Sequence, residues 1–215
     1  MKIKKIWHQY RQLILLIFFL LIFSVLAVGV IRKSLSSFDM IIYQFIIQFK
    51  TNWLTHFFKV ITNFSNSICL LLICLLIIIF IKNKQKSQFV FLNLINIVLL
   101  NILLKELFSR PRPFELMLIT ENGYSFPSGH SMASMAFYGF IIYLICHSNW
   151  SKKSKMISNL LLSILILLIG ISRIYLGVHY ASDVIAGFSI SMAYLLIYIY
   201  FVEKNKRWED VKEKI

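Results

Sequence analysis

The chain alternates long apolar runs with short polar segments, a pattern that predicts a bundle of membrane-spanning helices. A helix needs about 20 apolar residues to cross a bilayer, and six stretches meet or approach that length. They are residues 13–31, 60–81, 89–107, 131–147, 156–176 and 184–202. The first run follows several basic residues, as a signal peptide does. It is long and lacks a convincing small-residue cleavage site, so we interpret it as a retained helix.

The segment 34–59, between the first two runs, has a different pattern. Its bulky apolar residues recur at helical spacing, with polar residues between them. They are Phe38, Ile41, Ile42, Phe45, Ile46 and Phe49. The pattern predicts an amphipathic helix in the outer membrane interface, which either guides a lipid into the bundle or packs over it. The expected fold is therefore all-α, a polytopic membrane protein of six transmembrane helices plus one interfacial helix.

Composition agrees with a membrane protein. Hydrophobic residues make up 59% of the chain and charged residues 15%, and the mean hydropathy is +0.75. A soluble protein has roughly 45–50% apolar and about 25% charged residues, so a typical cytosolic enzyme or a disordered chain is excluded. The three cysteines, Cys69, Cys74 and Cys146, have neither the spacing of a disulfide framework nor that of a metal site.

The net charge of +14 is explained by membrane topology rather than by nucleic-acid binding. With six spans and the N-terminus inside, 15 of the 23 lysines and arginines fall in segments on the side of both termini. Basic residues concentrate in cytoplasmic loops, so we expect both termini in the cytoplasm. Residues 203–215, of mixed charge, are expected to form a cytoplasmic tail. No nucleic-acid partner is expected, and the oligomeric state is open.

Candidate chemistry gathers in the two expected outer loops that flank the fourth and fifth spans. Lys105 is followed seven residues later by Arg112-Pro113, and a lysine with an arginine suits phosphate oxygens. Pro127-Ser128-Gly129-His130 directly precedes an apolar helix, whose N-terminus attracts anions. Ser128 could instead cap that helix, and the cations could extend to lipid headgroups.

The second of these loops contains Arg173, His179 and Asp183. If the segment is helical, His179 and Asp183 lie four residues apart on one face, where a carboxylate can hold one ring nitrogen. That contact makes the other nitrogen a better nucleophile or base. A lone His–Asp pair is often structural, so the pair gains meaning only with the two segments before it.

Together the three segments read Lys-x6-Arg-Pro, Pro-Ser-Gly-His and Ser-Arg-x5-His-x3-Asp. This resembles the type 2 phosphatidic acid phosphatase family, the membrane relatives of the vanadium haloperoxidases. Every motif position is matched, and the six-span layout extends the likeness to nearly the whole chain. The chain looks most like the small bacterial members that act on phosphatidylglycerophosphate or undecaprenyl pyrophosphate. Arg110 lies outside the strict motif, and its role is open.

The resemblance implies a fold and an activity. The fold would have a haloperoxidase-like phosphatase core, and residues 1–215 would form one integral-membrane domain with its catalytic motifs in 105–183. The enzyme would hydrolyse a phosphate or pyrophosphate ester of a membrane lipid at the outer face of the cell membrane. It would need no metal or other cofactor, and its partners would be the lipid substrate and the bilayer.

The resemblance also assigns roles to residues. His179 would attack phosphorus and form a phosphohistidine, Asp183 would orient it, and His130 would protonate the leaving oxygen and later take a proton from water. The residues expected to hold the phosphoryl oxygens are Lys105, Arg112, Ser128, Gly129 and Arg173. Two alternatives stay open. One is a transporter or lipid-binding protein with a phosphate site but no hydrolysis, and the other is a zinc site built on the two histidines and Asp183.

Overall fold

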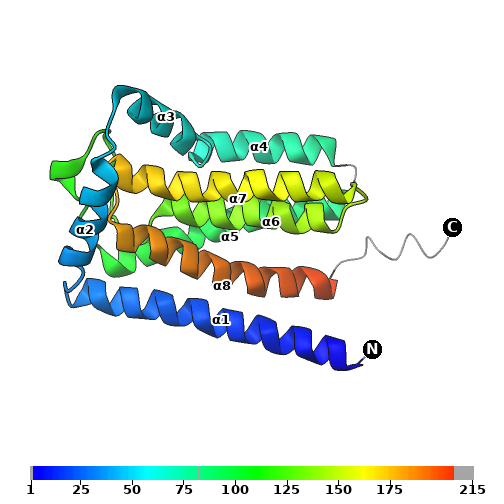
Figure 1. Cartoon of the computed structure of the whole chain (residues 1–215). Coiled ribbons are helices and arrows are strands. Elements are labelled where there is room, and N and C mark those ends of the chain that lie inside the picture. Colours follow the sequence, from blue (N-terminus) through cyan, green and yellow to red (C-terminus); the bar gives the residue numbers. More distant parts are fainter. Residues whose placement is uncertain (1, 82, 206–215) are drawn as a thin grey trace.

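The computed structural model describes residues 2–81 and 83–205, and those residues form a helical bundle (Figure 1). Five helices among them are long and apolar enough to cross a membrane. They are α1 (Lys2–Ile31), α5 (Lys84–Phe108), α6 (Gly129–Cys146), α7 (Lys152–Tyr175) and α8 (Ala181–Asn205). The expected all-α membrane fold is thereby confirmed. α8 continues to Asn205, so the predicted tail begins inside this helix, and residues 206–215 lie outside the described part.

The predicted second span is not one continuous helix. Residues 60–81 fall on the end of α3 (Asn52–Asn63) and on α4 (Ser67–Phe80), a helix pair bent by 52° at a short break, as in a broken span or a re-entrant loop. The break follows from the polar residues at its start. Asn66 caps α4 by accepting a hydrogen bond from the Ile68 amide, and Ser65 donates to the carbonyl oxygen of His130 in α6 at 2.8 Å. The break therefore fixes the α3–α4 corner beside the start of α6.

The expected interfacial segment is also divided. α2 (Ser36–Ile47) lies across one end of the bundle in Figure 1, and α3 begins five residues after α2 ends. Thr51 separates the two helices because its side chain caps α3, accepting from the Leu54 amide at 3.1 Å. α2 packs against α7 and α8 through Ile42, Tyr43 and Ile46. The helical periodicity of 38–47 was therefore correctly predicted, but a single helix over 34–59 was wrong.

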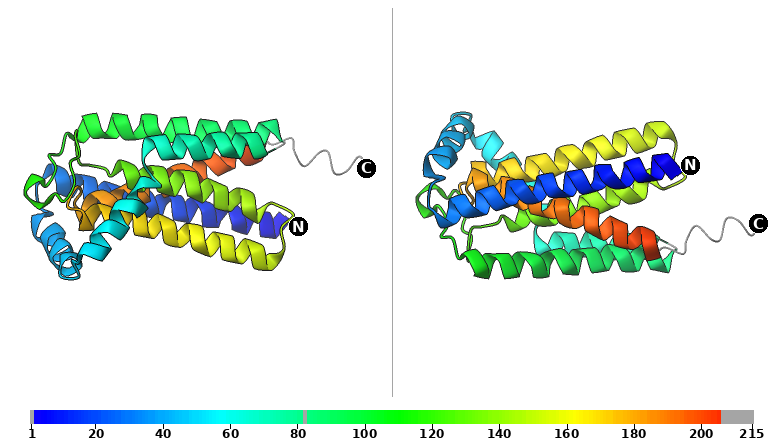
Figure 2. Two further views of the ribbon diagram at one scale, coloured as in Figure 1. Left: turned by 90° about the horizontal axis from the view of Figure 1, so that it is seen from above. Right: turned by 90° about the horizontal axis from the view of Figure 1, so that it is seen from below.

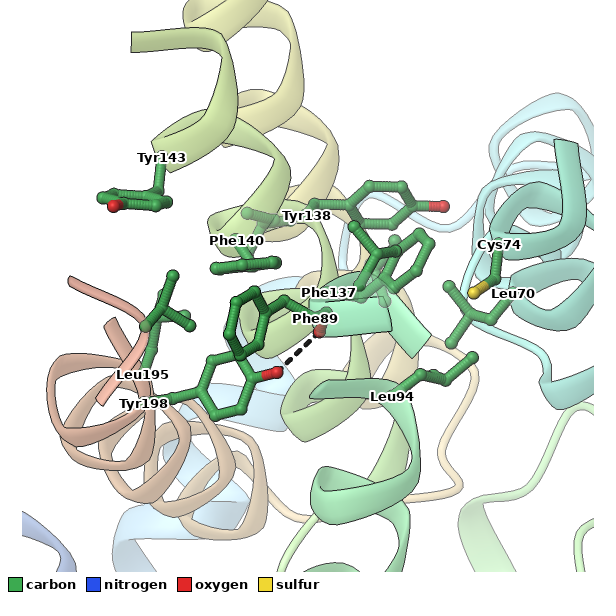
Figure 3. Packing of buried hydrophobic residues seen from close by; sticks show 14 residues of the cluster. Leu70, Cys74, Phe89, Leu94, Phe137, Tyr138, Phe140, Tyr143, Leu195 and Tyr198 are labelled. Atoms are coloured by element: carbon green, nitrogen blue, oxygen red, sulfur yellow. Dashed lines mark hydrogen bonds between the residues drawn. The ribbon is translucent and has the colours of Figure 1, made fainter. Parts of the chain in front are cut away.

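The bundle is held together by a layer of aromatic residues between α5, α6 and α8. Phe89, Phe137, Phe140 and Tyr198 are buried side by side (Figure 3). The Tyr198 hydroxyl donates to the carbonyl oxygen of Phe89 at 2.6 Å, so this polar group is satisfied inside the apolar layer. α1 packs along α8 at the edge of the bundle (Figure 2). This core fixes the helix ends that carry the sequence motifs.

Both motif loops lie at the same end of the bundle, opposite the start of α1 and the end of α8 (Figure 1). One is the loop from α5 to α6, which contains the short helix η1 (Phe114–Leu116), and the other is the turn from α7 to α8. The two loops are joined by a backbone hydrogen bond from Leu118 to the carbonyl oxygen of Leu176, at 2.9 Å. The α5–α6 loop and the α7–α8 turn, which are far apart in sequence, therefore meet at the end of the bundle where α5 and α7 end and α6 begins.

The turn from α7 to α8 depends on Gly177. This residue has a φ of +69°, and a Cβ atom added to it would lie 1.9 Å from the carbonyl oxygen of Leu116. Gly123 offers a matched comparison, because its φ is +75° but nothing lies within 4 Å of an added Cβ. A side chain at residue 123 would be unfavourable only because of the positive φ. A side chain at residue 177 would also collide with Leu116 and push η1 away from the turn.

We expect Gly177→Ala to destabilise the protein clearly more than Gly123→Ala. The left-handed conformation alone costs about 1–2 kcal/mol for a residue with a Cβ. Thermal unfolding in detergent should place the melting temperature of Gly177→Ala well below that of Gly123→Ala. Equal melting temperatures would contradict the close approach of Gly177 to Leu116.

Candidate active site

The motif residues surround one cavity of about 590 Å³ at this end of the bundle. Its polar wall includes Lys105 of α5, Arg112 of the following loop, His130 of α6 and His179 of the α7–α8 turn. The rest of its lining is mostly apolar and comes from α4 and α5. The two histidines, which are far apart in sequence, therefore line the same cavity, as the sequence motifs require.

His179 is placed by the C-terminal end of α7. The carbonyl oxygen of Arg173 accepts hydrogen bonds from the amides of Val178 and His179, each at 3.2 Å. These bonds wind the chain back over the helix end, with Gly177 at the left-handed position of the turn. His179 therefore lies before α8 rather than on it, so the expectation that it shares a helical face with Asp183 was wrong. The two side chains nevertheless lie close together.

The contacts of His179 assign its ring protons. Nε2 lies 3.2 Å from Nη1 of Arg112, and Nδ1 lies 3.3 Å from the Ser125 hydroxyl and 3.5 Å from Oδ2 of Asp183. An arginine can only donate, so Nε2 is the acceptor and Nδ1 carries the proton of the neutral ring. The Ser125 hydroxyl in turn donates to Oδ2 of Asp183 at 2.5 Å. The Nε2 lone pair is thus directed to the cationic side of the site.

His179 is kept neutral by its surroundings. Burial lowers the pKa of His179 well below its ordinary value, and the charges of Arg173, Arg112 and Lys105 lower it further. A neutral imidazole keeps its lone pair and can act as a nucleophile at neutral pH.

Two of the predicted phosphate-binding cations are held by backbone oxygens of one loop. Arg112 donates from Nε to the carbonyl of Gly123 and from Nη2 to that of Asn122, both at 3.0 Å. Nζ of Lys105 donates to the carbonyl of Tyr124 at 2.8 Å. These carbonyls carry no net charge, so the bonds hold the two cations in place without neutralising them.

Arg173 is fully buried behind the cavity. Its guanidinium donates to the Thr62 hydroxyl at 2.6 Å and forms an ion pair with Glu121. Its Nε is buried and has no hydrogen-bond partner within the described ranges 2–81 and 83–205. Arg173 is absent from the cavity lining, so its predicted contact with phosphate stays a prediction.

Ser128 and Gly129 form the start of α6. The Ser128 hydroxyl oxygen accepts from the Ser131 amide at 3.4 Å and from the Ser131 hydroxyl at 3.0 Å, so it caps the helix. Its predicted contact with phosphate stays a prediction. Gly129 lines the cavity, and a Cβ atom on it would lie 2.8 Å from Oδ1 of Asn101. A side chain at residue 129 would therefore require Asn101 to move.

Sequence reasoning missed several polar residues of the site, namely Asp39, Thr62, Glu121 and Ser125. It also left Arg110 without a role, and the structure pairs this residue with Asp183. Glu121 is notable because it lines the cavity and its carboxylate also lies 4.0 Å from Nη2 of Arg112. The available signal was weak, because Glu121 is one of two glutamates, with Glu115, in a loop that also contains Arg110 and Arg112. Ser125 gave no comparable signal.

The zinc alternative requires three ligating side chains at one point. Within the described part of the chain, no group of three or more His, Cys, Asp or Glu side chains is placed to hold a metal ion. Independence from metals stays a prediction for a chelation experiment.

Comparison with known proteins identifies the family. The model of the PAP2 superfamily matches residues 86–207. The chain is 32% identical to phosphatidylglycerophosphatase B of Bacillus subtilis over 206 residues, which are 94% of this chain and all of that protein. This chain belongs to the PAP2 superfamily. It is a multi-pass membrane protein and a lipid phosphatase of that superfamily.

Solved structures agree with this assignment. The crystal structure of the transmembrane PAP2-type phosphatidylglycerolphosphate phosphatase from Bacillus subtilis superposes with a TM-score of 0.81 at 32% identity, covering 93% of this chain and 99% of that one. The crystal structure of LpxE from Aquifex aeolicus gives a TM-score of 0.61 at 25% identity, covering 75% and 94%. The resemblance inferred from the motifs is thus confirmed over nearly the whole chain.

The environment of His179 predicts how this residue titrates. Because its pKa is lowered, the ring should stay neutral as the pH falls through 6.5, the ordinary value for histidine, and should gain a proton only below it. Ring nitrogen NMR of ¹⁵N-histidine protein, assigned with His179→Gln, measures this midpoint. Arg112→Gln should raise the midpoint by removing a nearby cation. A midpoint at or above 6.5 in the unaltered protein would contradict the arrangement.

Proposed function

We propose that this protein removes the terminal phosphate from a lipid phosphate or pyrophosphate at the outer face of the cell membrane, through a phosphohistidine on His179. The observation that carries the proposal is the composition of the cavity. Its polar wall brings two histidines and two cations together, and the same cavity continues between α4 and α5 along Leu71, Phe91 and Val98. A lipid headgroup fits the first part, and the tail fits the second.

The first step transfers the phosphoryl group to the protein. Nε2 of His179 attacks phosphorus, the bond from phosphorus to the lipid oxygen breaks, and His130 gives that oxygen a proton. The resulting phosphoimidazolium carries positive charge, which the nearby Asp183 carboxylate stabilises through Ser125. In the second step His130 takes a proton from water, the water oxygen attacks phosphorus, and the P–N bond breaks to release inorganic phosphate.

The remaining motif residues stabilise charge on the transferring group. Lys105 and Arg112 lie beside both histidines, and the start of α6 at Gly129 lines the same cavity. Arg173 adds its unpaired Nε from behind, and Ser128 is proposed to contribute its hydroxyl. Phosphoryl transfer needs mainly positioning and such charge stabilisation. The reaction is therefore proposed to proceed without a metal and to survive thorough chelation.

Two substrates fit this chemistry, each favoured by a different observation. The Bacillus subtilis relative is named for phosphatidylglycerophosphate, which favours that lipid. The loop charges favour an outward-facing site, because most basic residues lie on the side of the termini and the two motif loops are at the other end. Undecaprenyl pyrophosphate presents its headgroup at the outer leaflet, so the outward-facing site favours this lipid.

We propose that residues 1–215 form one domain, because α1 and α2 both pack against α8.

The test compares phosphate release from both lipids and from a small soluble phosphate ester, in detergent, with two matched variants. Val98→Trp fills the apolar part of the cavity. Leu103 is on the same helix but is exposed and outside the cavity lining, so Leu103→Trp is the control. Val98→Trp should raise KM at least tenfold for the lipid while sparing the soluble ester. Leu103→Trp should change neither.

Each outcome of this comparison bears on the proposal. A lipid-selective loss in Val98→Trp supports it, and the better of the two lipids identifies the headgroup preference. Equal losses on lipid and soluble ester would contradict the assigned tail path. Lipid binding without any phosphate release would favour the alternative of a transporter or lipid-binding protein. Loss of all release on chelation, restored by added zinc, would contradict metal independence.

A further inference from the structure

Arg110 lies only two residues from Arg112, yet the two side chains have different surroundings. Arg112 lines the cavity, whereas Arg110 is absent from the cavity lining and its guanidinium lies 3.9 Å over the ring of Tyr180. Its Nη1 donates to Oδ1 of Asp183 at 2.6 Å. Arg110 therefore reaches the carboxylate behind His179 and does not contribute to the phosphate-binding wall.

The second amino group of the Arg110 guanidinium binds the carboxylate of Asp39, a residue of α2. Nη2 of Arg110 donates to Oδ2 of Asp39 at 2.7 Å. Asp39 is only 3% exposed although α2 lies across the end of the bundle. Burying a carboxylate is expensive unless it is paired and hydrogen-bonded, so the location of Asp39 requires these partners.

Ser182 completes a closed set of hydrogen bonds. Its amide donates to Oδ1 of Asp39 at 2.8 Å, and its hydroxyl donates to Oδ2 of Asp39 at 2.9 Å while accepting from Arg110 at 2.8 Å. Asp39 thus binds a free amide at the N-terminus of α8, where the helix dipole favours a negative charge. The same helix turn carries Asp183, so α2 holds the segment that presents the carboxylate to His179.

We propose that Asp39 and Arg110 are positioning residues for phosphoryl transfer, which hold Asp183 in register with His179 and make α2 part of the active site. This inference rests on the proposed role of His179 as nucleophile. Asp183 has one oxygen for Arg110, and its other oxygen accepts from Ser125 and from the Tyr180 amide at 3.0 Å. With the first oxygen fixed, the second can point only toward the Nδ1 side of His179.

The proposal separates catalysis from substrate binding. Removing Arg110 leaves Lys105, Arg112 and Arg173 in place, so affinity for the phosphate should be retained. It frees the Asp183 carboxylate to rotate, and a misplaced carboxylate stabilises the phosphoimidazolium poorly. Replacing partners that orient the ligands of metal sites typically costs about 10–100-fold, and we expect a loss of the same size here. The loss should therefore fall on kcat and not on KM.

The experiment measures kcat and KM of purified full-length variants on a lipid phosphate in detergent, with the melting temperature of each. Arg110→Gln and Asp39→Asn remove one charge each, Asp39→Asn without a change of size. Arg110→Lys keeps the positive charge but cannot donate to both carboxylates at once as the guanidinium does. Glu106→Gln removes an exposed carboxylate near the end of α5 and serves as the control. We expect Arg110→Gln to lower kcat 10–100-fold with KM changed less than threefold, and Arg110→Lys to recover part of the loss.

The double variant Asp39→Asn/Arg110→Gln tests whether the two residues act through one another. If the two residues hold Asp183 in one network, the loss in the double variant should be clearly smaller than the product of the two single losses, because coupled residues are non-additive. Multiplicative losses, an unchanged kcat in both single variants, or a rise of KM at constant kcat would each overturn the proposal. So would a loss of activity that merely follows the loss of folded protein.

Failure of this proposal differs visibly from failure of the proposed function. If unaltered protein releases phosphate and His179→Ala abolishes release, the proposed function stands, and the variants of Arg110 and Asp39 decide whether these two residues position Asp183. If His179→Ala retains full activity, the nucleophile assignment fails, and the positioning role fails with it.

Discussion

The site depends on a buried imidazole that is fixed on both sides. His179 has Arg112 against one ring nitrogen, with Ser125 and Asp183 near the other. This arrangement determines which ring nitrogen keeps its lone pair, where that lone pair points, and that the ring is uncharged. Each partner is itself fixed, Arg112 by loop carbonyls and Asp183 by three donors from two loops. The fold can be understood as the scaffold that brings these segments to one end of a lipid-embedded bundle.

Such a site places many charges in a small volume, and the structure balances them locally. Three cations meet at or behind the cavity, and Glu121 offsets part of that charge by pairing with Arg173. Behind His179, one arginine lies between two buried carboxylates. Buried charges are tolerated only when they are paired in this way. The bent helix pair α3–α4 also helps to fix this charge, since the Thr62 hydroxyl at the end of α3 accepts a hydrogen bond from Arg173.

The sequence predicted the parts of the molecule that have a local signal. Apolar runs gave the long helices, and the three motifs gave Lys105, Arg112, His130, His179 and Asp183, all of which the structure brings to one site. The bend at 64–66 was missed because an apolar run does not reveal whether a polar residue such as Asn66 is tolerated within a helix or starts a new one. Ser125 was missed because its partners are distant in sequence. Asp39 did leave a trace: it is the sole acidic residue of 34–59, and it shares a helical face with Ile42 and Ile46, which are packed on the bundle.

The central claim, that phosphate passes through His179, is tested most directly by trapping the intermediate. The protein is mixed with a lipid carrying a ³²P-labelled terminal phosphate and quenched in alkali, under which phosphohistidine survives, and the labelled residue is mapped by mass spectrometry. The account predicts one labelled site, on His179, which is lost in His179→Ala. In a variant that lacks His130, a substrate with a good leaving group should still label His179, and the label should accumulate because no base activates the hydrolytic water. Label on any other residue, or full turnover by His179→Ala, would contradict it.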